Sequence, residues 1–223
     1  MGPRLIVITG LPGTGKTTLA RRICREQRIA LLSKDAIKES LLDVFSPQGL
    51  QHDVARPPMS QLEMRPTHES QSARLISRTL SDAAFAILFR LGGELLRANL
   101  DVILEGNFRG GEHEPAVLAI QPERAQVLQI LCRVEESVRL WRLACRERTA
   151  ARHPGHRAEL AVHRAPECDI FLQLPGPRYL HSAGSTMEKS AEMAEFPTTL
   201  EPALAATLSA FLQPANHDGS SRL

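Results

Sequence analysis

The 223-residue sequence lacks several features that mark particular classes of protein. Its early apolar run, residues 5–8, is too short for the core of a signal peptide or for a membrane span. A formal net charge of +2 gives no reason to expect a membrane partner or an extended nucleic-acid surface. No two cysteines are spaced C-x-x-C, which argues against a zinc site or a disulfide framework and favours a reducing cytoplasm; the four are Cys24, Cys132, Cys145 and Cys168.

Lysine is also scarce, since only four of the 27 basic residues are lysines. We attribute the excess of arginine to genomic base composition. Hydrophobic and charged contents of 43% and 23% are ordinary for a globular protein, and the chain is long enough to bury a full core. We expect one domain over residues 1–213, a disordered tail over 214–223 and no internal repeats, in a monomer or homodimer.

Apolar segments of strand length alternate with segments of helical periodicity along the chain. This alternation predicts an α/β fold in which helices cover both faces of a five-stranded parallel sheet. The fifth strand is expected at either 169–174 or 178–183, and a proline-rich surface loop at 46–68. The other strands are expected at 4–10, 29–33, 101–108 and 125–134, and the helices at 16–27, 34–45, 75–99, 135–150 and 199–212.

A phosphate-binding motif follows the first expected strand. The residues GLPGTGKT match G-x-x-x-x-G-K-[ST], with a strand before and a helix after. The backbone N–H groups of such a loop converge on phosphate, the lysine reaches the β and γ phosphates, and the threonine hydroxyl joins the Mg²⁺ shell. Thr18 either helps to position phosphate or is simply an early helical residue. The expected ATP-binding residues are Gly10, Leu11, Pro12, Gly13, Thr14, Gly15, Lys16, Thr17 and Thr18.

This loop together with the segment LLSKDAIKESLL at 31–42 resembles the P-loop kinases of small molecules and of polynucleotide 5′ ends. Relatives of chloramphenicol phosphotransferase and zeta toxin share the pattern, and such kinases are grouped with AAA-family ATPases. The resemblance implies a P-loop NTPase fold, ATP and Mg²⁺ as cofactors, and Lys16 and Asp35 as catalytic residues. Lys38 stands where polynucleotide kinases often carry an arginine, which implies a contact with the acceptor.

Asp35 has two interpretations. A carboxylate at this point could take the proton of an acceptor hydroxyl while orienting it for attack. An aspartate just before the sequence AIKESLL could equally cap the helix that begins there. The two roles are compatible.

The stretch LEGNFR at 104–109 ends the third expected strand and is similar to the L-D-G-F-P-R pattern of nucleoside monophosphate kinases. The similarity implies that Glu105 holds the metal together with Thr17. It also implies that Asn107 and Phe108 line the acceptor pocket and that Arg109 faces the active site. The alternative is that Glu105 merely ends a strand and that Arg109 is a solvated loop residue.

Arginines crowd the helix expected after the fourth strand. Nucleotide and shikimate-type kinases close a basic lid from this location, so we expect a lid over about 139–157 in which Arg146, and next Arg142, contacts the transferred phosphate. Arg139, Arg148 and Arg152 are further candidates, and the turn HPGH, residues 153–156, is expected within the lid. The alternative is a solvated basic face paired with Glu135, Glu136 and Glu147.

The leading hypothesis is an ATP-dependent kinase that phosphorylates a hydroxyl of a small molecule. A nucleic-acid end, in a polynucleotide 5′-hydroxyl kinase, is the alternative acceptor, and it would need a basic channel for the strand. No N-K-x-D guanine-binding motif follows the fourth strand, which argues against a GTPase. The chain is short for an oligomeric motor, whereas a protein that binds nucleotide without turnover stays open as an alternative.

Overall fold

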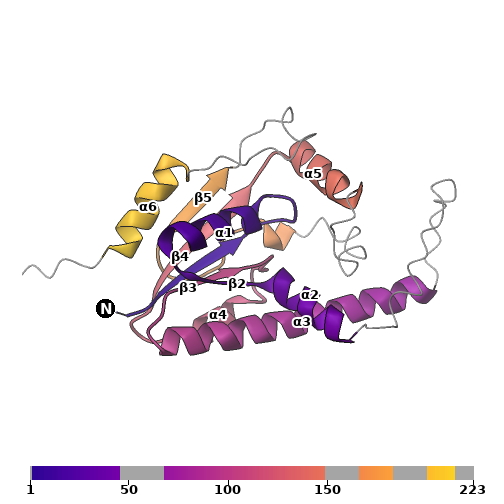
Figure 1. Cartoon of the computed structure of the whole chain (residues 1–223), viewed down its shortest axis with the longest axis horizontal. Coiled ribbons are helices and arrows are strands. Elements are labelled where there is room, and N and C mark those ends of the chain that lie inside the picture. Colours follow the sequence, from indigo (N-terminus) through magenta and orange to yellow (C-terminus); the bar gives the residue numbers. More distant parts are fainter. Residues whose placement is uncertain (1, 46–67, 149–165, 183–199, 214–223) are drawn as a thin grey trace, which may run out of the picture.

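The computed structural model describes residues 2–45, 68–148, 166–182 and 200–213. These residues form a sheet of five parallel strands with helices packed on it (Figure 1). The strand order across the sheet is β2-β3-β1-β4-β5, and all four pairings between neighbours are parallel. The predicted α/β architecture is therefore confirmed. The strands are β1 (Arg4–Thr9), β2 (Ala30–Ser33), β3 (Val102–Glu105), β4 (Gln126–Arg133) and β5 (Arg178–Ser182).

The fifth strand forms at the second of its two expected positions. Residues 169–174 are irregular instead, although Leu172 and Leu174 are buried in the core. A short helix at 114–119 was not predicted. The helices are α1 (Lys16–Gln27), α2 (Lys34–Phe45), α3 (His68–Arg97), α4 (Glu114–Ala119), α5 (Glu136–Arg148) and α6 (Pro202–Leu212), with a 3₁₀ turn, η3 (Pro166–Cys168).

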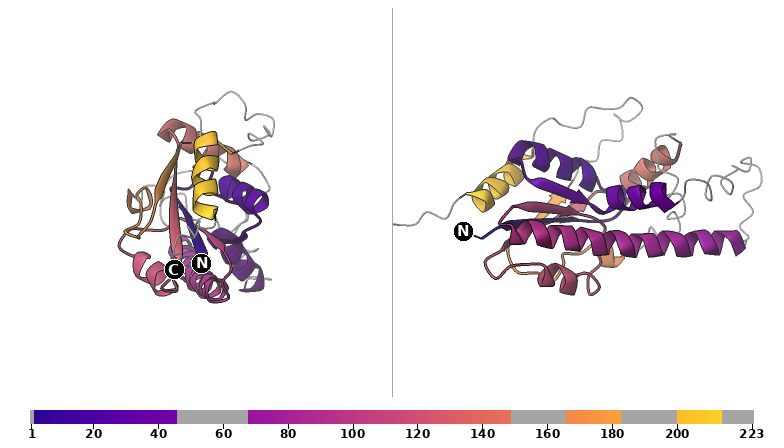
Figure 2. Two further views of the ribbon diagram at one scale, coloured as in Figure 1. Left: turned by 90° about the vertical axis from the view of Figure 1, so that its left-hand side faces the viewer. Right: turned by 60° about the horizontal axis from the view of Figure 1, so that its bottom comes forward.

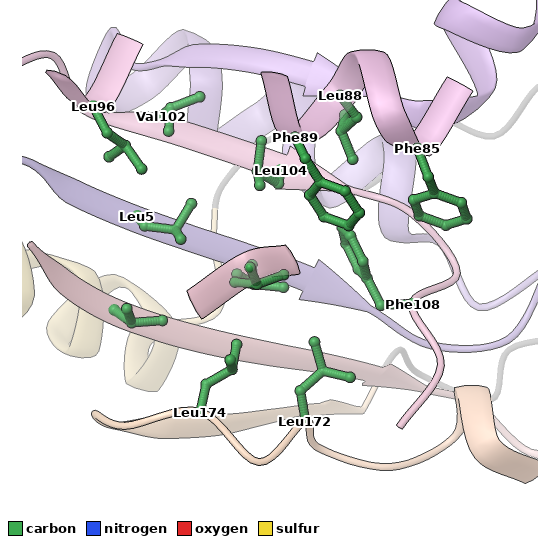
Figure 3. Packing of buried hydrophobic residues seen from close by; sticks show 13 residues of the cluster. Leu5, Phe85, Leu88, Phe89, Leu96, Val102, Leu104, Phe108, Leu172 and Leu174 are labelled. Atoms are coloured by element: carbon green, nitrogen blue, oxygen red, sulfur yellow. The ribbon is translucent and has the colours of Figure 1, made fainter. Parts of the chain in front are cut away.

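Alternate side chains of the central strands point to opposite faces of the sheet and pack into two hydrophobic cores, one on each face. Leu5 and Val7 of β1 pack with α3 and α4. Figure 3 labels Leu5 and the α3 residues Phe85, Leu88 and Phe89 of this core. Ile6 and Ile8 point to the opposite face and pack with α1 and α6. A strand that is apolar on both faces is typical of a parallel sheet covered on both sides. The sheet is thus the middle of three layers.

The long helix α3 runs along the sheet and extends beyond it (Figure 2, right). It continues without a break through Gly92 and Gly93, where the sequence suggested a weakening. A Cβ atom added at Gly92 would lie 3.0 Å from Leu104 Cδ2 on β3. The glycine therefore serves a close approach between helix and sheet rather than a bend.

All strands are parallel, so their carboxyl ends meet at one edge of the sheet, where ligands bind in folds of this kind. The segments that leave β1, β2, β3 and β4 at this edge carry most of the predicted site residues. In the described parts of the chain, no helix is both long and apolar enough to cross a membrane. Of the loop expected at 46–68, residues 46–67 lie outside the described residues and His68 begins α3. The lid beyond residue 148 and the tail from 214 lie outside the described residues as well.

Candidate active site

The phosphate loop connects β1 to α1 and adopts a backbone that favours glycine. Gly10, Gly13 and Gly15 have φ angles of +135°, +89° and +91°, a region that side chains rarely tolerate. A Cβ atom at Gly10 would also lie 2.3 Å from the carbonyl oxygen of Cys132 on β4. The loop can therefore follow this path only with glycine at its start.

Hydrogen bonds within the loop converge on one carbonyl group. Lys16 Nζ donates to Leu11 O over 2.9 Å, and Thr14 Oγ1 donates to the same oxygen over 2.8 Å. The Lys16 side chain is buried and folds back over the loop. Its ammonium group thus lies against the loop that is expected to receive phosphate.

Glu105 is the last residue of β3, which lies between β1 and β2. Its carboxylate accepts hydrogen bonds from two hydroxyl groups, one on α1 and one on β2. Thr17 Oγ1 donates to Glu105 Oε1 over 3.2 Å, and Ser33 Oγ donates to Glu105 Oε2 over 2.6 Å. Ser33 and Glu105 are register partners in the sheet. Thr17 and Glu105, both expected to hold the metal, are thus joined by a hydrogen bond, and Ser33 is a further partner of Glu105 that was not predicted.

Burial is the main influence on the Glu105 carboxyl group. It raises the pKa of Glu105 above the model-compound value of 4.5, whereas the Lys16 charge and the Ser33 and Thr17 hydroxyls act in the opposite direction. The nearby charge of Asp35 raises the pKa further. A bound cation would offset the unfavourable burial of the ionised carboxylate.

The oxygen atoms of Thr17 and Glu105 suit Mg²⁺, which commonly binds one or two protein oxygens while water and phosphate oxygens complete its shell. Within the described residues, no group of three or more His, Cys, Asp and Glu side chains could form a metal cage by itself. The residues present thus fit a cation that arrives with the phosphates of a nucleotide.

Asp35 lies in the first turn of α2, which begins directly after β2. Its side chain is 50% exposed, and its Oδ1 is 3.2 Å from the Nζ atom of Lys34. The Lys34 side chain is itself buried, with Nζ 5.7 Å from the centre of the Phe85 ring. Because α2 starts at Lys34, Asp35 lies within the helix rather than at the cap position before it. The structure leaves its carboxylate accessible at the sheet edge.

Two residues expected to meet the acceptor are enclosed by protein. Lys38 is fully buried and its Nζ donates to Ser77 Oγ on α3 over 2.8 Å, so α2 is joined to α3 at this point. Phe108 is also fully buried, and its ring centre lies 5.5 Å from that of Phe85 and 6.1 Å from that of Phe89 (Figure 3). The expectation that Phe108 lines the acceptor pocket is therefore wrong, because the ring fills the core beneath α3.

The rest of the segment after β3 is held by polar contacts. Arg109 Nη1 lies 3.1 Å from Glu112 Oε2, and the Arg109 backbone N–H donates to His113 Nδ1 over 2.8 Å. Burial lowers the pKa of His113, which favours the neutral ring that accepts this bond. The Cys168 thiol of η3 lies 3.6 Å from the carbonyl oxygen of Asn107. Asn107 and Arg109 are only partly buried, and both stay candidates for contact with the acceptor.

Helix α5 brings its first arginine to the phosphate loop. Arg139 Nη1 donates to Pro12 O over 3.4 Å, and the Arg139 side chain is 2% exposed. Arg142 is half-buried, which lowers its pKa, and Arg146 is exposed. A role for Arg146 and Arg142 in binding phosphate stays a prediction. Residues 149–157, which include the expected turn HPGH, lie outside the described residues.

The sequence carries only a weak signal for Ser33 and for the contact of Arg139 with the phosphate loop. Ser33 is the last residue of a short strand, but its partner becomes visible only once β2 is known to lie beside β3. Arg139 shares a helical face with Arg142 and Arg146 by its spacing, yet only the angle of α5 decides which arginine meets the loop.

Comparison with solved structures supports the fold. A candidate kinase from Chloroflexus aurantiacus J-10-fl is 26% identical with a TM-score of 0.69, and the alignment covers 96% of this chain and 100% of that one. A sugar kinase from Janibacter sp. HTCC2649 is 15% identical, covering 82% of this chain and 86% of that chain, with a TM-score of 0.48. A gluconokinase from Sinorhizobium meliloti 1021 is 14% identical, covering 82% and 85%, with a TM-score of 0.42. These last two scores are too low to support an inference.

None of the curated proteins compared with the sequence matches it. The family model described as an AAA domain matches residues 5–166, which include the phosphate loop, Asp35, Glu105 and α5. The match covers well over half of the chain and agrees with the strand order and the loop geometry. The chain therefore belongs to the AAA domain family and has the P-loop NTPase fold.

Proposed function

We propose that the protein is a kinase that transfers the γ-phosphoryl group of ATP to a hydroxyl of a small molecule. The observation that carries this proposal is the juxtaposition of the Thr17–Glu105 hydrogen bond, at the end of the phosphate loop, with the half-exposed carboxylate of Asp35. The influence of Asp35 on the pKa of Glu105 supports their proximity. The similarity to the candidate kinase from Chloroflexus aurantiacus points in the same direction.

Each of these residues has a separate task in the reaction. The backbone N–H groups of residues 10–15 and the Lys16 ammonium bind the phosphates. Thr17 and Glu105 would hold Mg²⁺, which neutralises charge on the β- and γ-phosphate oxygens when it is bound. Asp35, at the start of α2 and half-exposed, would remain available to the acceptor.

Asp35 accepts the proton of the acceptor hydroxyl as that oxygen forms its bond to the γ-phosphorus. The bond between the γ-phosphorus and the bridging oxygen breaks, its electron pair stays on that oxygen, and ADP leaves. Lys34, 3.2 Å from Asp35 Oδ1, orients the carboxylate. Because the transition state of phosphoryl transfer is loose, orientation of the hydroxyl contributes as much as basicity.

Transfer of labelled γ-phosphate tests the proposal directly. The protein would be incubated with labelled ATP, Mg²⁺ and a panel of hydroxyl metabolites, antibiotics and 5′-hydroxyl oligonucleotides. Asp35→Asn should retain ATP binding while the rate of transfer falls by about 10²–10⁴-fold, the usual contribution of a general base. Asp43→Asn, an exposed aspartate on the same helix, is the matched control and should transfer normally.

The panel also separates the alternatives. Label on an oligonucleotide end alone would replace the small-molecule acceptor by a nucleic-acid end. Release of free phosphate only, at equal rates in wild type and Asp35→Asn, would contradict the kinase proposal and indicate an ATP-hydrolysing or ATP-sensing domain.

A further inference from the structure

Helix α5 contains a buried arginine for which the reaction outlined above has no use. Arg139 lies in the first turns of α5, and its side chain is 2% exposed. A guanidinium group stays charged in proteins, and burial of a charge is unfavourable unless it is paired and hydrogen-bonded. The burial of Arg139 therefore requires an explanation in its contacts.

Two of these contacts form a fork with one carboxylate. Arg139 Nε donates to Glu136 Oε2 and Arg139 Nη2 donates to Glu136 Oε1, both over 2.7 Å. Glu136 lies one helical turn earlier and its side chain is 60% exposed. Such a bidentate pair fixes the plane of the guanidinium group. Glu136 thereby determines where the remaining donor, Nη1, points.

That remaining donor is directed at the phosphate loop. Arg139 Nη1 lies 3.4 Å from the carbonyl oxygen of Pro12. The next residue, Gly13, has a φ angle of +89°, and a Cβ atom there would lie 3.2 Å from Arg139 Cγ and 3.2 Å from Leu143 Cγ. Arg139 and Leu143 are four residues apart and share a face of α5. This face lies directly against the loop at Pro12 and Gly13.

We infer that Arg139 is a positioning residue of the phosphate loop, held in place by Glu136. Its guanidinium group binds the carbonyl of Pro12 while its stem packs on Gly13, which keeps the following N–H groups aimed at phosphate. A nucleotide-binding loop gains affinity from such preorganisation, because less order has to be created on binding. The inference rests on the proposed function only for the premise that the loop binds nucleotide.

Nucleotide affinity without any acceptor tests this role. Dissociation constants for ADP and ATP would be measured by calorimetry for wild type, Arg139→Met, Arg139→Lys and Glu136→Gln. Arg139→Met should weaken both nucleotides by about tenfold or more, the effect of losing a hydrogen bond from a charged donor. Arg139→Lys keeps the charge without the fork and should lie between Arg139→Met and wild type. Glu136→Gln, which frees the fork, should also weaken binding.

The matched control is Arg133→Met. Arg133 is another arginine with a carboxylate partner, since its Nε donates to Asp169 Oδ1 over 3.0 Å, but it lies at the exposed end of β4. This variant should bind ADP nearly as tightly as wild type, because exposed ion pairs contribute little. An equal loss of affinity in Arg133→Met and Arg139→Met would overturn the inference.

Thermal melting of the unliganded proteins separates positioning from stability alone. A purely structural Arg139 would lower the melting temperature and leave the ADP dissociation constant unchanged well below it, and that result would overturn the inference. If Arg139→Met does not fold, normal ADP affinity in both Arg139→Lys and Glu136→Gln would overturn it. Loss of affinity in these variants, from a protein that transfers no phosphate to any acceptor, would contradict the kinase proposal but support the role of Arg139.

Discussion

At the scale of single residues, Glu105 shows the cost of burying a carboxylate. Burial raises the pKa of Glu105, so the folded chain holds this proton more tightly than the unfolded chain does. The group therefore contributes stability below its unfolded pKa, about 4.3 for Glu, and this contribution is lost as the pH rises through the raised folded-state pKa. Above that pKa the ionised carboxylate would favour cation binding at the expense of stability.

Glu105→Gln should for this reason raise the melting temperature of the unliganded protein at pH 8, by about 2–4 °C for each kcal/mol regained. The gain should shrink as the pH is lowered through the raised pKa of Glu105, because the wild-type side chain then takes up its proton. The same variant should lose Mg²⁺-dependent transfer. Glu123→Gln, at an exposed position before β4, is the control for the loss of one charge.

A melting temperature below that of wild type at pH 8 would contradict this prediction. It would mean that the hydrogen bonds from Thr17 and Ser33 outweigh the cost of burying the charge.

Residue-level patterns predicted the phosphate loop, which one segment encodes, but not the contacts of Ser33 and Arg139, which depend on how segments pack. Gly10 to Thr17 form the phosphate loop as expected, because backbone geometry and glycine positions are local properties. Phe108 was misplaced since its burial depends on the rings that α3 carries over β3. The contact of Arg139 with Pro12 was not predicted, because the tilt of a helix against a loop leaves no trace in the spacing of the helix residues.

At the scale of elements, α3 shows how packing can override propensity. Glycine inside a helix is unfavourable by about 1 kcal/mol relative to alanine. Gly92 is nevertheless buried where α3 passes β3, with the prospective Cβ 3.0 Å from Leu104. The sequence therefore suggested a weak point at a position where the helix is pressed most closely to the sheet.

Gly92→Val should consequently destabilise the protein by about 1–3 kcal/mol, the usual cost of overpacking a core. The added methyl groups would force Leu104 or the helix to move. Chemical denaturation would measure the change. Valine is a better helix former than glycine, so unchanged or raised stability in Gly92→Val would show that the contact with β3 contributes nothing.

At the scale of the whole molecule, the alternation of strands and helices predicted the parallel sheet, and the positions of the first four strands followed from compact apolar runs. The order β2-β3-β1-β4-β5 depends on long-range pairing, which periodicity does not contain. The choice between residues 169–174 and 178–182 for the last strand was open for the same reason. The apolar side chains of Leu172 and Leu174 reach the core without a strand.

Ligand binding at the edge of the central strands should stabilise the whole domain. Mg²⁺ and ATP at 100 times the dissociation constant should add about 2.7 kcal/mol to the free energy of unfolding. For a chain of this length the melting temperature should rise by about 5–11 °C. Lys16→Ala should abolish most of this rise while keeping the melting temperature of the unliganded protein close to that of wild type. A full ATP-dependent rise in Lys16→Ala would contradict the assignment of the phosphate loop.

The carbonyl group that excludes a side chain at Gly10 belongs to Cys132. The burial of the Cys132 thiol has a practical consequence for chemical labelling. Burial raises the pKa of the Cys132 thiol to about 12, and Cys168 is buried as well. A thiolate-directed reagent would therefore react first at the half-buried Cys24 and Cys145. Cys145 lies on α5, so a fluorophore attached there would travel with the helix that supports the phosphate loop and report its movement from a native position.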